Sequence, residues 1–308
     1  MSDTSASLRR KINSAGDLQS VVRTMKALAA SSIGQYERSV LALANYFRTV
    51  ELGLSVCLRQ SKGTELIPKP GPQNDAGPIN VIVFGSDQGL VGQFNEVIAE
   101  YAIKSLAPLP GTPQIWAVGE RVHARLGDAG PTLRGVLTVP TSVKAITPLV
   151  GKILVQSEPL DHIHDHEAAS LYLFYNHPTS DAAYTPVAQR LLPLDEQWRN
   201  TLDATPWPNK NIPQVMGSGT ATLGALVREY LFVSVFRACA ESLASENASR
   251  LAAMQRADKN VDDLLEVLNG TFHQLRQQGI DEELFDVVSG FDALVEQAAH
   301  PCAPRPPP

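Results

Sequence analysis

The chain opens with a long amphipathic pattern. No proline stands between about Ser5 and Leu58. Apolar or small residues recur there at every seventh position, in the series Ala15, Val22, Ala29, Tyr36, Leu43 and Val50. A second row runs beside this series, made of Leu18, Met25, Ile33, Val40, Phe47 and Leu54. A seven-residue repeat is typical of a coiled-coil seam, so the segment predicts one long helix that pairs with another helix.

A second segment with the same period runs from about Val215 to Gln297. Its seam positions are Ala240, Asn247, Met254, Val261, Leu268 and Leu275, and its companion row is Leu243, Arg250, Ala257 and Leu264. Polar residues such as Asn247 and Arg250 lower the stability of a seam but can fix its register. Gly270 and Gly279 mark places where a bend or break of this helix is expected.

The residues between the two periodic segments follow another pattern. Pro, Gly and polar residues dominate 61–78, as is typical of a linker. Four short apolar runs follow: "INVIVF", "QIWAVG", "GVLTVP" and "SLYLFYN". They alternate with the helical patterns "GQFNEVIAEYAIKSL" and "TSVKAITPLVGKILVQ". Strand and helix alternation of this kind predicts a small α/β domain with a largely parallel sheet.

The predicted fold class is therefore α+β. The N- and C-terminal segments form a long antiparallel two-helix coiled coil, because pairing is the simplest way to bury both seams, and a Rossmann-like α/β domain is inserted between them. The predicted parts are an N-terminal helix (1–60), a linker (61–78), the α/β domain (79–195), a connecting loop (196–214), a C-terminal helix (215–297) and a disordered tail (298–308).

Composition and charge narrow the function classes. Hydrophobic residues make up 44% of the 308 residues and charged residues 19%, which is typical of a globular protein. The net charge of −6 gives no reason to expect nucleic-acid binding. Cys57, Cys239 and Cys302 form no CxxC pair, so a reducing, cytosolic setting fits best. The N-terminus has no signal core, and no run of about 20 apolar residues stands in the sequence, so we expect membrane association only through partners.

Two stretches carry candidate chemistry, and each has a plainer interpretation. The glycines of "FGSDQGLVGQFN" resemble a phosphate-binding turn, but their spacing fits no nucleotide fingerprint, so a structural strand–turn–helix is favoured. His162, His164 and His166 alternate in "DHIHDHE" as metal ligands on one strand face would, but a solvated loop is favoured. We predict no catalytic residue, no cofactor and no metal site.

Four motifs resemble those of the gamma subunit of F-type ATP synthases and ATPases. They are "KINSAGDLQSVVRTMKALAASS", "SDQGLVGQFN", "ESLASENASRLAAM" and "IDEELFDVVSGFDAL". They stand in the family's order and cover both terminal helices and the start of the α/β domain. The chain departs from the family's pattern at Gln88, which replaces the usual Arg, and at Val91, Gln93, Asp281 and Asp286. These departures leave open a divergent paralogue, such as the alternative sodium-type ATPases.

The resemblance implies a central rotor shaft. In this family the paired helices turn inside a hexamer of three alpha and three beta subunits, and the α/β domain forms a foot on the epsilon subunit and the ring of c subunits. The shaft is no enzyme itself. It couples ion translocation in the ring to ATP synthesis or hydrolysis, because its asymmetric surface favours different nucleotide states in the beta subunits. The implied location is peripheral, on the cytoplasmic face of the bacterial inner membrane.

The resemblance also implies the residues that contact the alpha and beta subunits. They are Arg23, Met25, Lys26, Arg250, Met254, Arg276 and Gln277. The small residues of "SLASENASRLAA" suit a surface that turns in a sleeve without interlocking. Two other functions stay open from the residues alone: a nucleotide-binding α/β enzyme with helical arms, and a coiled-coil scaffold with no rotary role.

Overall fold

The chain falls into two compact units. One combines residues 1–25 with 254–308, and the other holds residues 26–253. The computed structural model describes residues 4–60, 79–156, 170–179, 184–194, 196–211, 213–216 and 218–299. The predicted linker, the histidines His162, His164 and His166, and the tail after Ala299 lie outside the described residues.

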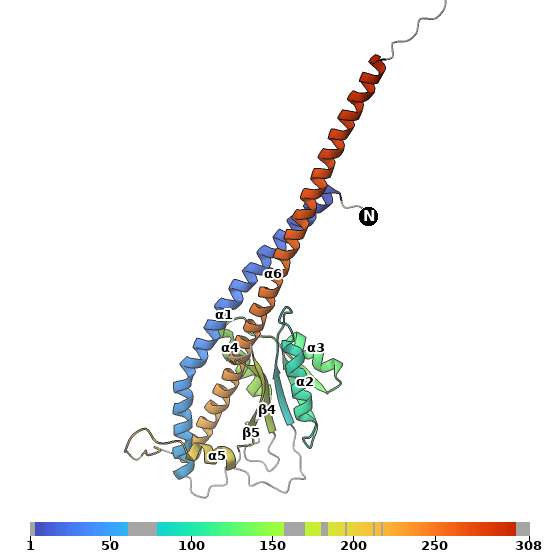
Figure 1. Cartoon of the computed structure of the whole chain (residues 1–308). Coiled ribbons are helices and arrows are strands. Elements are labelled where there is room, and N and C mark those ends of the chain that lie inside the picture. Colours follow the sequence, from blue (N-terminus) through green and yellow to red (C-terminus); the bar gives the residue numbers. More distant parts are fainter. Residues whose placement is uncertain are drawn as a thin grey trace, which may run out of the picture. The chain divides into compact units, whose positions relative to one another are not determined.

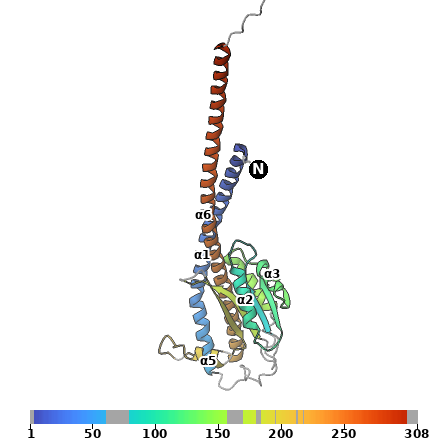
Figure 2. The same cartoon turned by 45° about the vertical axis from the view of Figure 1, so that its right-hand side comes forward.

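Two long helices, α1 (Ser5–Gln60) and α6 (Gly219–Ala299), contribute to both units, and their parts in the first unit run antiparallel (Figures 1 and 2). Arg23 donates to Asp258, with 3.1 Å between Nε and Oδ1, and Gln19 donates to Asp262. Residue numbers therefore fall along one helix as they rise along the other. The seam between them buries apolar side chains to 1–7% exposure: Leu8, Ala15, Val22, Met254 and Val261. The predicted antiparallel pairing is confirmed for this unit.

The two helices also pair within the second unit. The rings of Phe47 and Tyr230 stack with their centroids 5.7 Å apart, and the Tyr46 hydroxyl donates to Glu229 at 2.8 Å. Among the described helices, α1 alone is long and apolar enough, by length and composition, to cross a membrane. Its heptad positions Tyr36 and Val50 belong to the core that it shares with α6.

The heptad series identifies most of the seam in α1. Its buried members are Ala15, Val22, Ala29, Tyr36 and Val50. Two positions of the companion rows are wrong: Leu18 is 53% exposed, and Leu264 is 48% exposed while its neighbour Leu265 is half-buried. The main series stays buried or half-buried from Ala15 to Val50, so the wrong positions belong to the companion rows, which lie at the edge of the seam. Of the bend or break expected at Gly270 and Gly279, a break is absent, because α6 is helical through both glycines.

The second unit is built around a five-stranded sheet in the order β3-β2-β1-β4-β5. Its strands are β1 (Ile79–Phe84), β2 (Pro113–Val118), β3 (Leu133–Leu137), β4 (Ser170–His177) and β5 (Thr185–Leu192). The first four strands pair in parallel, and β5 pairs antiparallel with β4. The predicted inserted α/β domain is confirmed. Strand β5 was not predicted, because Pro186 and a weak apolar alternation conceal it, and both are compatible with an edge strand.

Helices cover both faces of this sheet (Figure 1). On one face, α2 (Phe94–Leu106) and α3 (Glu120–Asp128) share an apolar core with β1 and β2, in which Ile98 and Val122 are fully buried. On the other face, α4 (Val143–Gln156) shares a second core with the unit's parts of α1 and α6. The sheet is thus buried on both sides, as is usual for parallel sheets.

A further helix, α5 (Glu196–Asp203), occupies part of the segment that we expected to be a connecting loop. Its Leu202 is 2% exposed, and the ring of its Trp198 lies edge-on to Tyr230 with centroids 5.4 Å apart. A short apolar spacing within a polar stretch was too weak a signal to predict this helix.

The small polar stretch of α6 is also its most buried part. Every residue from Ala238 to Glu246 is buried. The expectation that "SLASENASRLAA" turns inside a sleeve is therefore wrong for Ser242–Glu246. Small side chains instead let α6 lie close to the chain's own α/β domain, where Ser245 Oγ donates to the carbonyl of Asn176 at 2.9 Å.

We predict that Val22→Ala opens the helix pair of the first unit more readily than Leu18→Ala. Val22 is 6% exposed and Leu18 is 53% exposed. Removing buried methyl groups costs about 1–3 kcal/mol, whereas trimming a largely exposed side chain costs about 0.5 kcal/mol or less. Amide hydrogen exchange over residues 5–25 and 254–276 measures the difference as lower protection in the Val22 variant. Equal protection in the two variants would contradict the seam.

Candidate functional site

Of the predicted contact residues on α1, Arg23 is exposed but already holds partners. Its Nε lies 3.1 Å from Asp258 Oδ1, and its Nη2 lies 3.5 Å from Asp262 Oδ1. Met25 and Lys26 are half-buried. A partner that meets this stretch of α1 therefore meets an ion-paired surface and not a free cation.

The predicted residues in the first unit's part of α6 differ in exposure. Met254 is 2% exposed and belongs to the helix seam, so its side chain is not offered to a partner. Arg276 and Gln277 are exposed. Of these three predicted residues, only the two that stand further along the chain are therefore available to a partner.

The last part of α6, residues 277–299, is here called the free end. Its exposed apolar side chains, each 51–75% exposed, are Ile280, Leu284, Phe285, Val287, Val288, Phe291 and Val295. Most of them recur at steps of three or four, which places them on one face of the helix. Within the described residues of the first unit nothing covers this face, and α6 runs on beyond the start of α1 (Figure 2). The free end also carries six acidic residues and neither Lys nor Arg.

In the second unit, the turn after β1 is held by its own hydrogen bonds. The Ser86 N–H donates to Asn95 Oδ1 at 2.9 Å, and Asn95 Nδ2 donates back to Ser86 Oγ at 2.9 Å. The Asp87 carboxylate accepts the N–H groups of Glu120 and Val139, each at 3.0 Å. These bonds tie together the ends of β1, β2 and β3. They support the structural interpretation of the glycine-rich motif, because the side chains of Ser86, Asp87 and Asn95 are engaged in them.

A buried carboxylate holds α6 to the end of β4. Glu241 is 3% exposed, and its two oxygens lie 2.7 Å from Arg237 Nε and 2.8 Å from His177 Nδ1. The hydrogen bond to Glu241 raises the pKa of Arg237 above its ordinary value. A carboxylate this deeply buried is stable only when it is paired, so the cluster fixes α6 on the sheet.

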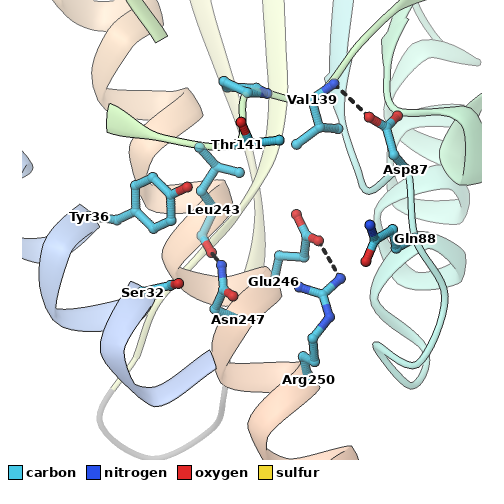
Figure 3. A pocket seen from close by; sticks show the side chains of 11 residues that line it. Ser32, Tyr36, Asp87, Gln88, Val139, Thr141, Leu243, Glu246, Asn247 and Arg250 are labelled. Atoms are coloured by element: carbon cyan, nitrogen blue, oxygen red, sulfur yellow. Dashed lines mark hydrogen bonds and ion pairs between the residues drawn. The ribbon is translucent and has the colours of Figure 1, made fainter. Parts of the chain in front are cut away.

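A polar cavity of 180 Å³ lies between α1, α6 and the loops after β1 and β3 (Figure 3). Arg250, another predicted contact residue, lines it and donates to Glu246, with 2.6 Å between Nη2 and Oε1. Burial raises the pKa of Glu246, and the Asp87 carboxylate raises it further, while the Arg250 guanidinium opposes both. With its side chain only 12% exposed, Arg250 faces this cavity and not an open surface. We call it the Glu246 cavity.

No group of three or more His, Cys, Asp or Glu residues suited to a metal ion is found in the part of the chain that the structure describes. Sequence reasoning did not find the Glu246 cavity, because Asp87, Gln88 and Tyr36 come from elements far apart in sequence. Nor did it find the uncovered face of the free end, although apolar residues at helical spacing beyond the start of the partner helix are a signal for it.

Comparison with known proteins gives one family. The family profile described as ATP synthase matches residues 4–294. The "ATP synthase gamma chain" of Syntrophus aciditrophicus (strain SB) is 26% identical over 303 residues, which cover 94% of this chain and 98% of that relative. The "ATP synthase gamma chain" of Granulibacter bethesdensis is 26% identical over 296 residues, which cover 93% and 98%.

Two solved structures share the fold. One is from the Euglena gracilis mitochondrial ATP synthase, OSCP/F1/c-ring, with a TM-score of 0.58 and 18% identity over 97% of each chain. The other is from the Tetrahymena thermophila mitochondrial ATP synthase, central stalk/c-ring, with a TM-score of 0.54 and 20% identity over 77% of this chain and 99% of that one. The likeness therefore extends over both the helices and the α/β domain.

We predict that Gly85→Ala destabilises the chain by about 1–3 kcal/mol. A Cβ at Gly85 would lie 2.3 Å from Val122 Cβ and 2.7 Å from Asn95 Oδ1, so the turn would have to open. The matched control is Gly151→Ala in α4, where a Cβ meets nothing within 4 Å. That change is expected to stabilise the helix by about 0.5–1 kcal/mol. Urea unfolding of the full chain measures both, and equal stabilities would show that the turn has room for a larger group.

Proposed function

The chain belongs to the gamma-subunit family of the ATP synthases, and we propose that it acts as the central rotor shaft of an F-type ATP synthase or ATPase. It is a non-catalytic subunit. The paired helices α1 and α6 turn inside a hexamer of alpha and beta subunits, and the α/β domain rests on the epsilon subunit and the c-subunit ring. The shaft thereby couples ion translocation to ATP synthesis or hydrolysis. The protein is peripheral to the membrane, on the cytoplasmic face of the bacterial inner membrane.

The observation that carries this proposal is the uncovered apolar face of the free end. Large apolar side chains at helical spacing that stay exposed mark a surface that binds a partner. The exposed apolar residues of the free end extend beyond one stripe of the helix surface, because Phe285 lies beside the stripe that holds Leu284 and Val288. A sleeve that surrounds the helix covers such a surface better than a single flat partner does.

The contact residues divide into two groups on this proposal. Gln277, the first residue of the free end, and Arg276 before it are exposed, so they meet the hexamer directly. Met254 and Arg250 act from the interior, because their burial makes them part of the shaft's own packing. Arg23 is ion-paired, so an acidic group of a partner subunit can bind its guanidinium only in competition with the Asp258 carboxylate.

The two solved structures that share the fold are of a central stalk with a c-ring and of an F1 with a c-ring, which supports this setting for the present chain. The nucleotide-binding alternative is disfavoured, because Ser86, Asp87 and Asn95 of the glycine-rich turn form hydrogen bonds within the domain. The alternative of a scaffold without a rotary role is tested by measuring how ion transport is coupled to ATP hydrolysis.

We predict that Leu264→Pro uncouples the complex, whereas Leu264→Ala does not. Proline within a helix removes a hydrogen bond and kinks the helix at a cost of about 3 kcal/mol or more, while Leu264 is 48% exposed and tolerates truncation. In the complex reconstituted into vesicles, ATP hydrolysis continues with the proline variant, but ion transport per ATP hydrolysed falls several-fold.

The alanine variant is the matched control, since it removes the same side chain without breaking the helix. Unchanged ion transport per ATP in the proline variant, with the kink shown by lower helix content, would contradict a mechanical role. An equal loss in both variants would assign the effect to a side-chain contact and not to stiffness.

A further inference from the structure

The seam of α6 ends where α1 begins. The antiparallel register places the first residue of α1 opposite Arg276. The seven-residue series of α6 is apolar from Met254 to Leu275, but its next members, Glu282 and Ser289, are polar and exposed. The apolar residues of the free end are therefore no continuation of the seam. They form a separate face, so a further helix that extends the α1 pairing would not cover them.

The free end has an apolar face and an acidic face. Successive residues of an α-helix are turned by about 100°, so a residue two positions away lies on nearly the opposite side. Glu282 and Asp286 stand two positions before Leu284 and Val288 and therefore lie on the opposite side of the helix. The side opposite the apolar face and its flanks carry the exposed acidic residues Asp281, Glu282, Glu283, Asp286 and Asp292.

These acidic side chains are uncompensated within the described part of the chain. They form no ion pair or hydrogen bond there, and no Lys or Arg stands between 277 and 299. Like charges three or four residues apart, such as Glu282 and Glu283 with Asp286, destabilise a helix. A partner that brings positive charge to this face would remove that repulsion, whereas an uncharged partner would not.

The charge of the free end also separates the classes of partner. A second copy of the chain would bring six more acidic residues to the same surface, and anionic lipids and nucleic acids would be repelled by those present. A partner surface that is apolar all round would bury the acidic face without a counter-charge, which is costly. A protein surface with both apolar and basic side chains is complementary to both faces.

We propose that the surface around the free end has an apolar wall and a basic wall, the second made of Lys or Arg side chains that face Glu282, Glu283 and Asp286. This inference rests on the proposed function, because it assigns this surface to the sleeve of the alpha–beta hexamer, and it adds the chemistry of that sleeve. The apolar wall supplies burial, and the basic wall fixes which side of the helix meets it.

The test is binding of the full chain to an alpha–beta hexamer assembled without it, measured at NaCl concentrations from about 0.05 to 0.5 M. Salt screens the attraction between exposed charges, so the affinity of the wild-type chain is expected to fall about ten-fold or more over this range. A neutral variant that combines Glu282→Gln, Glu283→Gln and Asp286→Asn is expected to bind about ten-fold more weakly at low salt, with a smaller salt dependence.

The matched control combines Glu100→Gln, Glu120→Gln and Asp128→Asn, which make the same change of charge at exposed positions of the α/β domain. It is expected to bind as the wild-type chain does. The neutral variant keeps every apolar residue of the free end and loses like-charge repulsion, so its α6 is expected to remain helical by circular dichroism. A weaker affinity therefore reports the lost charge and not a lost helix.

A wild-type affinity that does not change with salt would overturn the basic wall, as would equal affinities of the neutral and control variants. Either result leaves the rotor function standing, because the chain still binds the hexamer. A wild-type chain that does not bind the hexamer at any salt concentration would contradict the proposed function itself, and this proposal with it.

Two measurements on the full chain alone address the other occupants of the apolar face. Analytical ultracentrifugation is expected to show a monomer, and flotation with vesicles of phosphatidylcholine and phosphatidylglycerol is expected to show no binding. A dimer that Leu284→Ser dissociates would assign the apolar face to a second copy, and vesicle binding that the same change abolishes would assign it to lipid. Each of these results would overturn the proposal.

Discussion

The burial of the α1 and α6 seams against each other is the interaction on which the rest of the structure depends. Long isolated helices are only marginally stable in water, and most of their stability comes from packing an apolar face. In each of the two units the α1 and α6 segments supply that face for one another, through Val22 and Val261 in the first and through Phe47 and Tyr230 in the second. The α/β domain is thus inserted between two helices, each of which depends on the other to bury its apolar face.

The long helix α6 changes its environment along the chain, and its composition changes with it. Residues 238–246 are small, polar and fully buried against the chain's own domain. Two buried carboxylates lie there, Glu241 and Glu246, and each is paired with an arginine one turn away on the same helix. Such i, i+4 pairs neutralise a carboxylate without help from a distant element. They allow a helix with acidic residues to be buried, and the free end shows the opposite case of apolar residues left exposed.

The sequence was sufficient for the parts of the structure that a period determines. A heptad repeat identified Ala15, Val22, Ala29 and Tyr36 as buried, because one face of a helix meets one partner. It failed at Leu18, because a companion position beside the buried series is covered only where the partner helix is broad enough to reach it. Short elements such as β5 and α5 had too few apolar positions to show a period at all.

The candidate site was harder to predict, for a different physical reason. Met254 and Arg250 were expected on the surface because a motif resemblance says nothing about which side of a helix is covered. Their burial depends on partners contributed by other elements, and for Arg250 the cavity residues come from three separate stretches of the chain. To predict that the face of the free end is uncovered, one must know which residues of α6 lie opposite the start of α1. Only the antiparallel register of the two helices gives this.

A rotor shaft has to transmit a twisting moment, and the two units resist twisting by different means. In the second unit, α6 is fixed by groups from several directions: the Glu241–His177 pair, the Ser245–Asn176 hydrogen bond, and ring stacking with α1. In the first unit, Arg23, whose side chain is 58% exposed, pairs with Asp258, whose side chain is 13% exposed. The buried seam is the main restraint on relative rotation of the helices there, because it extends over several turns, from Leu8 to Val22 on α1. Elastic twist is therefore concentrated in the helix pair of the first unit, while in the second unit the α/β domain fixes α6 through these polar contacts.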